Sequence, residues 1–215
     1  MILRTLRLGR TPPWHVGEAT AAEDERARAM VDRRRAAEFL AGRRALRGLV
    51  AEVAGLDPDR VLPRYECPDC GVGEHGSPGF AAREDGDGGL VSAVPMAASA
   101  SRAGGWGLFA VEPVGDDAGR AIGVDLVAVA EFHRTIPEAA FSAAERRHLR
   151  RAGQPAIAAA QLWARKEALL KALGTGLRAD PAMVEVIDDP RVRDVDATGL
   201  GLPEGFVAAA ALRSG

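Results

Sequence analysis

The chain has 215 residues, of which 47% are hydrophobic and 27% charged, and its formal net charge is -2. This composition is typical of a soluble globular protein with enough residues to bury a sizeable core. The small net charge argues against a general nucleic-acid binder, which needs a broad positive surface, but it allows a local basic pocket.

The N-terminal residues are predicted to form a short extended arm that ends at Pro12 and Pro13. They contain no apolar core of the kind found in secretory signals, and no later segment supplies the roughly 20 apolar residues that span a bilayer. We therefore expect a cytoplasmic protein without a membrane partner.

A long helix is predicted from about Glu23 to Val53. Its inner face is defined by apolar residues at helical spacing: Phe39, Leu46, Leu49, Val50 and Val53. Arginines occupy much of the remainder, either as a solvated face or as groups that converge on an anion. A nucleic-acid-binding helix is the third interpretation, and it is disfavoured because acids such as Asp24 and Asp32 dilute the positive charge.

A glycine- and proline-rich loop is predicted from Leu62 to about Asp87. It contains the only two cysteines, Cys67 and Cys70, with His75 close behind and no second cysteine pair to complete a zinc site. A reduced structural loop is the main interpretation and a zinc site the alternative. A redox role for the two cysteines would need a strand-to-helix setting that the sequence does not show.

The rest of the chain alternates strand and helix patterns, which favours the α+β class. The predicted strands cover Leu90 to Val94, Trp106 to Val111, a stretch around Val124, Met183 to Ile187 and Gly205 to Leu212. Helices are predicted near Ser142 to Ala152 and around the segment that begins at Trp163. The loop from Pro113 to Arg120 is the expected boundary between two halves, residues 1–118 and 119–215.

The segment WARKEALLKALGTGL, from Trp163 to Leu177, carries the strongest chemical signal. At helical spacing Trp163, Glu167 and Lys171 fall on neighbouring turns, so a carboxylate and an ammonium group can face one ligand. Upstream, Asp125 is the single acid in an apolar strand-like run. The pattern indicates a phosphate- and metal-handling site. The alternatives are a surface pair between Glu167 and Lys171 and a turn acid at Asp125, and core packing is the expected main role of Trp163.

These motifs together resemble the 4′-phosphopantetheinyl transferase superfamily, Sfp type. The resemblance covers about Arg33 to Leu212, and it rests on GVD at 123–125, WARKEA at 163–168 with Lys171, GTGL at 174–177, RAAEFLAGR at 35–43, CPDCG and HGSP around 67–78, SAS at 99–101 and LPEGFVAAAAL at 202–212. It implies a monomer of two similar α+β subdomains related by a pseudo-twofold axis. It also implies an enzyme that transfers the phosphopantetheine arm of coenzyme A to a serine of an acyl or peptidyl carrier protein, releasing adenosine 3′,5′-bisphosphate.

The resemblance also implies roles for individual residues. Asp125 and Glu167 would hold Mg²⁺, which accepts one or two carboxylates beside phosphate oxygens and water. Glu167 is also the candidate general base, either directly or through a water on the metal, and Lys171 would face the pyrophosphate. The remaining candidates for binding coenzyme A are Arg35, Arg43, His75, Ser99 and Lys166. For Lys166, contact with a carrier protein or a solvated position are the alternatives to phosphate binding.

Three positions depart from the family pattern. Val127 stands where many members have a second acid, Ala100 where a histidine contacts coenzyme A, and Ser77 where a basic residue is common. Arg102 is a candidate to compensate for Ala100. Because of these departures, the alternative to an active transferase is a noncatalytic relative that binds coenzyme A or a carrier protein.

Overall fold

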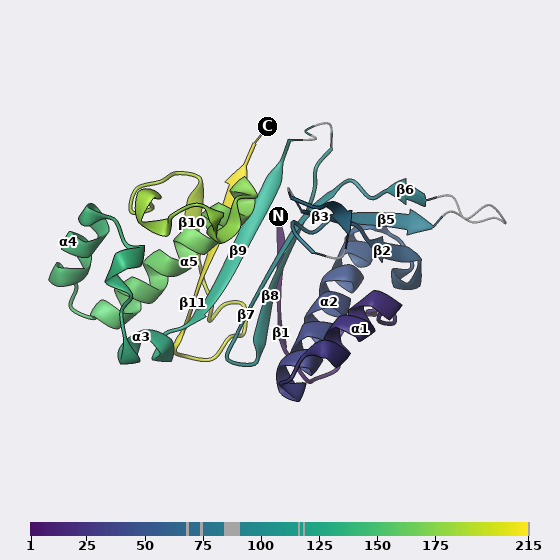
Figure 1. Cartoon of the computed structure of the whole chain (residues 1–215), viewed down its shortest axis with the longest axis horizontal. Helices are drawn as coiled ribbons and strands as arrows, with labels where there is room; N and C mark the ends of the chain where they lie inside the picture. The colour runs from purple at the N-terminus through teal and green to yellow at the C-terminus, as the bar shows by residue number, and fades with distance from the viewer. Residues whose placement is uncertain (68, 74, 84–90, 116, 118, 215) are drawn as a thin grey trace.

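A computed structural model describes residues 1–67, 69–73, 75–83, 91–115, 117 and 119–214, with the side chain of Leu177 left out (Figure 1). Its helices are α1 (Ala21–Ala29), α2 (Arg33–Ala54), α3 (Ala130–Arg134), α4 (Ala143–Arg151) and α5 (Pro155–Leu173). Short 3₁₀ turns are η1 (Pro58–Arg60), η2 (Glu138–Ala140), η3 (Gly176–Arg178) and η4 (Pro181–Met183). The strands are β1 (Ile2–Arg7), β2 (Val61–Pro63), β3 (Tyr65–Cys67), β4 (Gly71–Gly73), β5 (Phe80–Arg83), β6 (Val91–Ala93), β7 (Met96–Ala103), β8 (Trp106–Pro113), β9 (Ala121–Ala128), β10 (Val192–Val195) and β11 (Phe206–Arg213).

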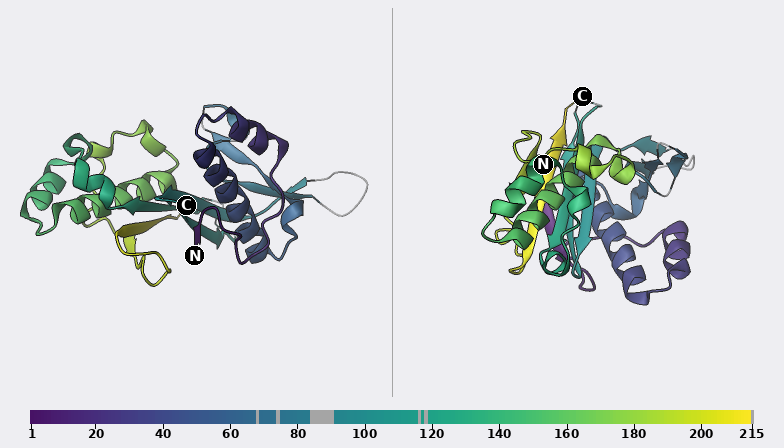
Figure 2. Two further views of the ribbon diagram at one scale, coloured as in Figure 1. Left: turned by 90° about the horizontal axis from the view of Figure 1, so that it is seen from below. Right: turned by 60° about the vertical axis from the view of Figure 1, so that its left-hand side comes forward.

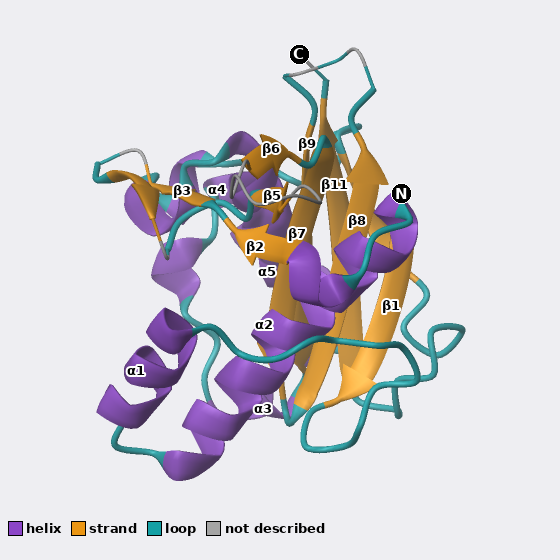
Figure 3. Cartoon of the chain, turned by 90° about the vertical axis from the view of Figure 1, so that its right-hand side faces the viewer, coloured by secondary structure: helices purple, strands orange, loops and turns teal. Residues whose placement is uncertain are grey.

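Two three-stranded antiparallel sheets form the centre of the molecule. Their strand orders are β1-β8-β7 and β10-β11-β9, and β7 lies beside β9 where the two sheets meet. The strands stand between two groups of helices, α1 and α2 on one side and α3 to α5 on the other (Figures 1 and 2). Viewed from the right-hand side of Figure 1, α2 crosses in front of β7 and β8, which it packs against (Figure 3). This mixture of helices and antiparallel sheets agrees with the expected α+β class, whereas the pseudo-twofold relation and the division at residue 118 stay predictions.

The predicted long helix is wrong in one respect, because the chain forms two helices with a break at 30–32. Asp32 caps α2 by accepting hydrogen bonds from the backbone N–H groups of Arg34 and Arg35, and α2 ends at Gly55 in the left-handed conformation. The expected inner face is confirmed for four members of the set, since Phe39, Leu46, Leu49 and Val50 are buried, and Val53 is half-buried.

Arg47 corrects the picture of a continuous solvated arginine face. Its guanidinium donates to the carboxylate of Glu23 at 3.0 Å, and both side chains are only 3% exposed. Glu23 also completes the capping box of α1 with Thr20. One carboxylate thus starts α1 and joins it to α2.

The C-terminal half of the molecule contains the same arrangement at α4 and α5. Ser142 and Glu145 form the capping box of α4, and the Glu145 carboxylate pairs with Lys166 of α5 at 2.7 Å, with both side chains fully buried. The two boxes have almost the same sequence, TAAE at 20–23 and SAAE at 142–145. Each short helix is therefore joined to a long helix by a glutamate in its first turn.

Several predicted elements are confirmed, and others are wrong. The strands at Trp106, Val124 and Gly205 correspond to β8, β9 and β11, and the polar helix corresponds to α4. The region from 62 to 87 is not simply a loop, because its described part contains the short strands β3, β4 and β5; residues 84–87 and Leu90 lie outside the described residues. No strand forms at Met183 to Ile187, where η4 gives way to irregular chain, and β10 follows instead.

None of the helices in the described part of the chain has both the length and the apolar character needed to cross a membrane.

The contact between α5 and β9 depends on Gly123. A Cβ atom at this position would overlap the carbonyl oxygen of Ala168 and lie 2.7 Å from the backbone nitrogen of Ala172. The missing side chain therefore lets the backbone of α5 rest directly on the strand. The small residues of α5 at the contact, Ala164, Ala168 and Ala172, are fully buried.

Substituting Gly123 by alanine should destabilise the fold. The added methyl group has no space, and overpacking typically costs about 1–3 kcal/mol. We expect a loss at the upper end of that range in urea unfolding. Gly153→Ala is the matched control, because a Cβ there meets nothing within 4 Å, and it should leave the free energy of unfolding almost unchanged. Equal stability of the two variants would contradict the proposed close packing.

Candidate active site

Asp125 lies on β9, on the same strand face as Gly123, beneath α5. Its side chain is 8% exposed, and Oδ1 accepts hydrogen bonds from Ser101 Oγ at 2.6 Å and from Lys171 Nζ at 2.7 Å. Lys171 also donates to the carbonyl oxygen of Val124 at 3.0 Å. Neighbours from β7 and α5 thus fix the orientation of this carboxylate.

Glu167 lies one helical turn before Lys171 on α5 and is half-buried. Burial raises the pKa of Glu167; the charge of Lys171 opposes this shift, and that of Asp125 adds to it. Glu167 Oε1 is buried and has no hydrogen-bond partner among the described residues. Two carboxylates and one ammonium group are therefore close enough to influence one another, and the two acids could hold a divalent cation.

A cavity of about 1330 Å³ opens beside this cluster. Its basic wall residues are Arg26, Arg43, Arg64, Arg102, Arg120, Arg178, Arg213 and Lys171, and its acidic ones among the described residues are Glu66 and Asp69. Asp125 and Glu167 are not part of this wall, so Lys171 is the residue that connects the carboxylates to the cavity. A cavity of this size and positive charge suits a large, multiply anionic ligand.

Three of these arginines surround the ring of Phe39 on α2. The guanidinium carbons of Arg26, Arg43 and Arg102 lie 5.4, 5.3 and 5.9 Å from the ring centre. Burial lowers the pKa of Arg102; the charge of Glu38 opposes this shift, and the charges of Arg43 and Arg26 add to it. Concentrating like charges at a partly buried position is unfavourable, and an anion bound among them would relieve the repulsion.

The glycine-rich end of α5 meets the loop that contains HGSP. Gly174 ends the helix in the left-handed conformation, and a Cβ at this residue would lie 4.0 Å from Ser77 Oγ. Nearby, Arg178 pairs with Asp69 at 3.1 Å. Two motifs that are about a hundred residues apart in the sequence therefore form adjoining parts of the cavity wall.

The structure brings some of the predicted binding residues to the cavity and not others. Arg43, Ser99 and Lys171 line it. The hydroxyl of Ser99 accepts a hydrogen bond from the backbone N–H of Val124 at 3.0 Å, so it also joins β7 to β9. Arg35 is not in the wall: its side chain is 82% exposed and lies 3.6 Å from Asp32. His75 is also outside the wall, close to the two cysteines.

Lys166 requires a correction, because it was expected either to bind phosphate or a carrier protein or to be solvated. Its ammonium group is fully buried and pairs with Glu145, and it donates to the carbonyl oxygens of Pro181, at 2.7 Å, and Val184. The position lies on the face of α5 that packs against α4. Lys166 therefore holds the fold together and does not reach the cavity.

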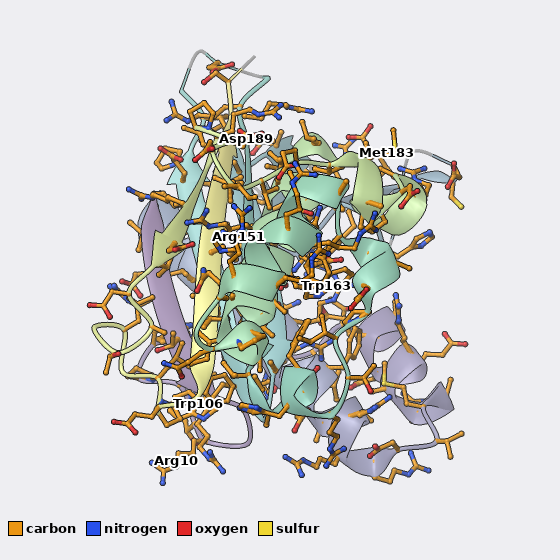
Figure 4. All side chains as sticks on the ribbon, turned by 90° about the vertical axis from the view of Figure 1, so that its left-hand side faces the viewer. Arg10, Trp106, Arg151, Trp163, Met183 and Asp189 are labelled. Atoms are coloured by element: carbon orange, nitrogen blue, oxygen red, sulfur yellow. The ribbon has the colours of Figure 1, made fainter. Side chains whose placement is uncertain are left out.

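Other residues at the site were missed or assigned differently from sequence. Ser101, which positions Asp125, was noticed only as part of the SAS segment. Arg26 is one of the helix arginines for which a solvated face and convergence on an anion were both open, and it lies beside Phe39 in the cavity wall. Arg102 was considered only as a substitute for a histidine at position 100, and it does line the cavity. The expected core role of Trp163 is confirmed, since it packs against the apolar cluster of the C-terminal half, among the helices seen in Figure 4.

A comparison with known protein families bears directly on this arrangement. Residues 121–195 match the model of the 4′-phosphopantetheinyl transferase superfamily. The matched stretch runs from β9 to β10 and contains Asp125, Glu167 and Lys171. No curated protein matches the chain. The match covers about a third of the chain and stops short of the arginines on α1 and α2.

Replacing Lys166 tests its structural role. Lys166→Met should lower the free energy of unfolding by about 3–5 kcal/mol, because it leaves the Glu145 carboxylate buried without its cation. Urea unfolding measures the loss. The double variant Glu145→Gln, Lys166→Met should recover part of it, since the amide keeps the capping box and removes the charge. A single variant as stable as the wild type would restore Lys166 as a candidate ligand-binding residue.

The raised pKa of Glu167 predicts how stability depends on pH. A raised pKa means that the folded protein binds this proton more tightly than the unfolded chain, so the charged carboxylate lowers stability at neutral pH. Without divalent metal, Glu167→Gln should therefore be more stable than the wild type at neutral pH. The gain should shrink as the pH falls through the raised pKa to the ordinary glutamate value, at about pH 4. Urea unfolding in chelator provides the measurement, with exposed Glu131→Gln as the control; a gain independent of pH would contradict the assignment.

Proposed function

We propose that this protein is a 4′-phosphopantetheinyl transferase of the Sfp type, which uses coenzyme A to prime a serine of an acyl or peptidyl carrier protein. The observation that carries the proposal is the position of Lys171, which pairs with Asp125 and lines the arginine-rich cavity. The proposal includes a monomer, a cytoplasmic location and two similar subdomains divided near residue 118. Carrier proteins of polyketide, nonribosomal peptide or fatty acid synthesis are the expected substrates.

Coenzyme A suits the charge of the cavity, because it carries a pyrophosphate and a 3′-phosphate. In this proposal the arginines around Phe39 bind the 3′-phosphate through forked hydrogen bonds. Arg43 keeps the role expected from its motif, Arg26 takes the place expected for Arg35, and Arg102 lies beside both. Lys171, which also lines the cavity, then faces the pyrophosphate.

Residues of this chain would act on the reaction as follows. The carrier serine oxygen forms a bond to the β-phosphorus, and the bond from that phosphorus to the bridging oxygen breaks, which releases adenosine 3′,5′-bisphosphate. Glu167 accepts the proton of the serine hydroxyl. Lys171 stabilises the charge that develops on the leaving phosphate.

The residues present fit a magnesium ion. Glu167 Oε1 is a buried oxygen without a hydrogen-bond partner, close to a second carboxylate, and such a pair offers the oxygen ligands that Mg²⁺ prefers. Asp125 and Glu167 would hold the ion. Bound there, Mg²⁺ would neutralise charge on the pyrophosphate oxygens.

The three departures from the family pattern have different surroundings. Val127 lies on the Asp125 face of β9 but belongs to the apolar cluster beneath α5, so no ligand replaces the missing acid at that position. Ala100 lines the cavity, as does Arg102 two residues on. Ser77 also lines it, opposite Gly174. Neighbouring arginines thus supply positive charge to the cavity near Ala100 and Ser77. Because of Val127 and Ala100, a noncatalytic relative that binds coenzyme A is the second candidate.

An intact-mass assay with coenzyme A, Mg²⁺ and several apo carrier proteins tests the proposal. We expect the phosphopantetheine mass increment on the carrier. Glu167→Gln should reduce the rate by about 100-fold or more, because a positioned base typically contributes about 10² to 10⁴. Asp125→Asn should also lower the rate strongly, because it removes a carboxylate ligand of the metal ion. Exposed Glu131→Gln should keep the wild-type rate. Mg²⁺ should also raise the melting temperature of the wild type but not of the two acid variants.

The outcomes separate the two candidates. Binding of coenzyme A with no increment on any carrier would favour the noncatalytic relative. Absence of both transfer and coenzyme A binding would reject both. Unchanged rates in the acid variants would show that the carboxylates have another role.

A further inference from the structure

A second cluster of metal-ligating side chains lies at the outer side of the cavity wall. The ligand atoms of Cys67, Cys70 and His75 all lie within 4.8 Å of one another. In tetrahedral zinc sites, Zn–S bonds of about 2.3 Å place two sulfur atoms about 3.8 Å apart, so the side chains need to close by only about 1 Å. We propose that these three residues bind a zinc ion, with water as the fourth ligand.

The described backbone on both sides of the cysteines favours this assignment. β3 ends at Cys67, β4 begins at Gly71, and these two residues face each other in the hairpin. Gly71 has φ +76°, a conformation that lets the chain reverse directly after Cys70. The backbone N–H groups of Asp69 and Cys70 donate hydrogen bonds to the Cys67 sulfur, so the turn itself holds one of the ligand atoms in place.

His75 is brought to the cysteines by a separate backbone contact. Glu66 and Ser77 exchange two hydrogen bonds, of 2.9 and 2.8 Å, which align the HGSP segment along β3. Gly76, the residue before Ser77, lies close against β3. A Cβ at this position would overlap the carbonyl oxygen of Glu66 and lie 2.7 Å from the backbone nitrogen of Cys67. Only glycine allows this close approach, and it places the preceding residue, His75, beside the pair.

Zinc binding fits this group of side chains better than a redox role of the two cysteines. Two thiolates neutralise a divalent cation, and a neutral imidazole adds a third ligand of the type zinc prefers. A thioredoxin-like redox pair would stand at the start of a helix, whereas these cysteines flank a hairpin turn. Both cysteines are reduced in the structure.

The ion would act on the cavity through its wall. Cys67, Gly76 and Ser77 line the cavity, and Asp69, between the two cysteines, pairs with Arg178 next to the end of α5. A bound zinc would therefore hold the β3–β4 hairpin and the HGSP segment as one rigid unit facing Gly174. This site does not depend on the proposed transferase activity.

Cobalt substitution tests the site in the full-length chain. Protein stripped of metal under reducing conditions should bind one Co²⁺ with the thiolate charge-transfer absorption and visible bands of tetrahedral cobalt, and Zn²⁺ should displace it. Cys67→Ser should abolish the charge-transfer band. Loss of an outer-shell partner of a metal ligand typically weakens metal binding by about 10- to 100-fold. Because His75 would be a direct ligand, His75→Gln should weaken Co²⁺ binding by more than that.

Two controls separate this site from the proposed magnesium site and from nonspecific binding. His133→Gln changes another exposed histidine, and Glu167→Gln removes a ligand of the other site; both should keep the wild-type cobalt spectrum. Reduced wild-type protein that shows no saturable thiolate–cobalt absorption would overturn the proposal, whether or not the cysteine variant folds. Retention of the band at wild-type affinity in His75→Gln would remove the histidine from the site and overturn the three-residue assignment.

Discussion

The close approach of α5 to β9 is the constraint on which the candidate active site depends. Because Gly123 has no side chain, the helix backbone rests on the strand, and the next residue on that strand face is Asp125. Glu167 and Lys171, four residues apart, then lie on the side of the helix nearest this carboxylate. A wider separation between helix and strand would leave Asp125 and Lys171 too far apart for their 2.7 Å contact.

Charge is distributed unevenly in a chain whose net charge is only -2. Two glutamates, Glu23 and Glu145, are buried against Arg47 and Lys166, and each also caps a short helix. Such pairs add little net stability, because desolvation offsets their attraction, but an unpaired partner would be very costly. The pairs therefore favour one packing arrangement, α1 against α2 and α4 against α5, over other pairings of these helices. The remaining arginines are then available to concentrate in the cavity wall.

Elements with strong periodicity or clear end signals could be predicted from the sequence. The inner face of α2, the polar helix α4 with its Ser142 cap, and the strands β8, β9 and β11 are examples. The break before α2 was missed because the apolar residues of the inner face begin only at Phe39, so their spacing does not mark a boundary before it, and the cap at Asp32 is the local signal. The small strands β3, β4 and β5 were missed because they have three or four residues each, too few for periodicity to show.

The site was predictable to the extent that helical spacing determines position. Residues four apart on α5 share a face, so Glu167 and Lys171 were correctly expected to lie on neighbouring turns. Arg35 and His75 were assigned by motif alone, and neither lines the cavity. Arg26 reaches Phe39 only because the chain turns back between α1 and α2, and no local pattern could reveal that contact.

The two lysines of α5, Lys166 and Lys171, show why residue type alone could not predict the role of a residue. Lys166 and Lys171 are five residues apart, so their side chains point about 140° apart around the helix axis. One ammonium group faces α4 and is enclosed with Glu145, while the other faces β9 and is 29% exposed at the edge of the cavity. The same helix thus uses one lysine to secure its own position and the other to meet a ligand. Because the first lysine helps to fix the helix, and the helix carries Glu167 and Lys171, the buried pair contributes to the geometry of the site without touching it.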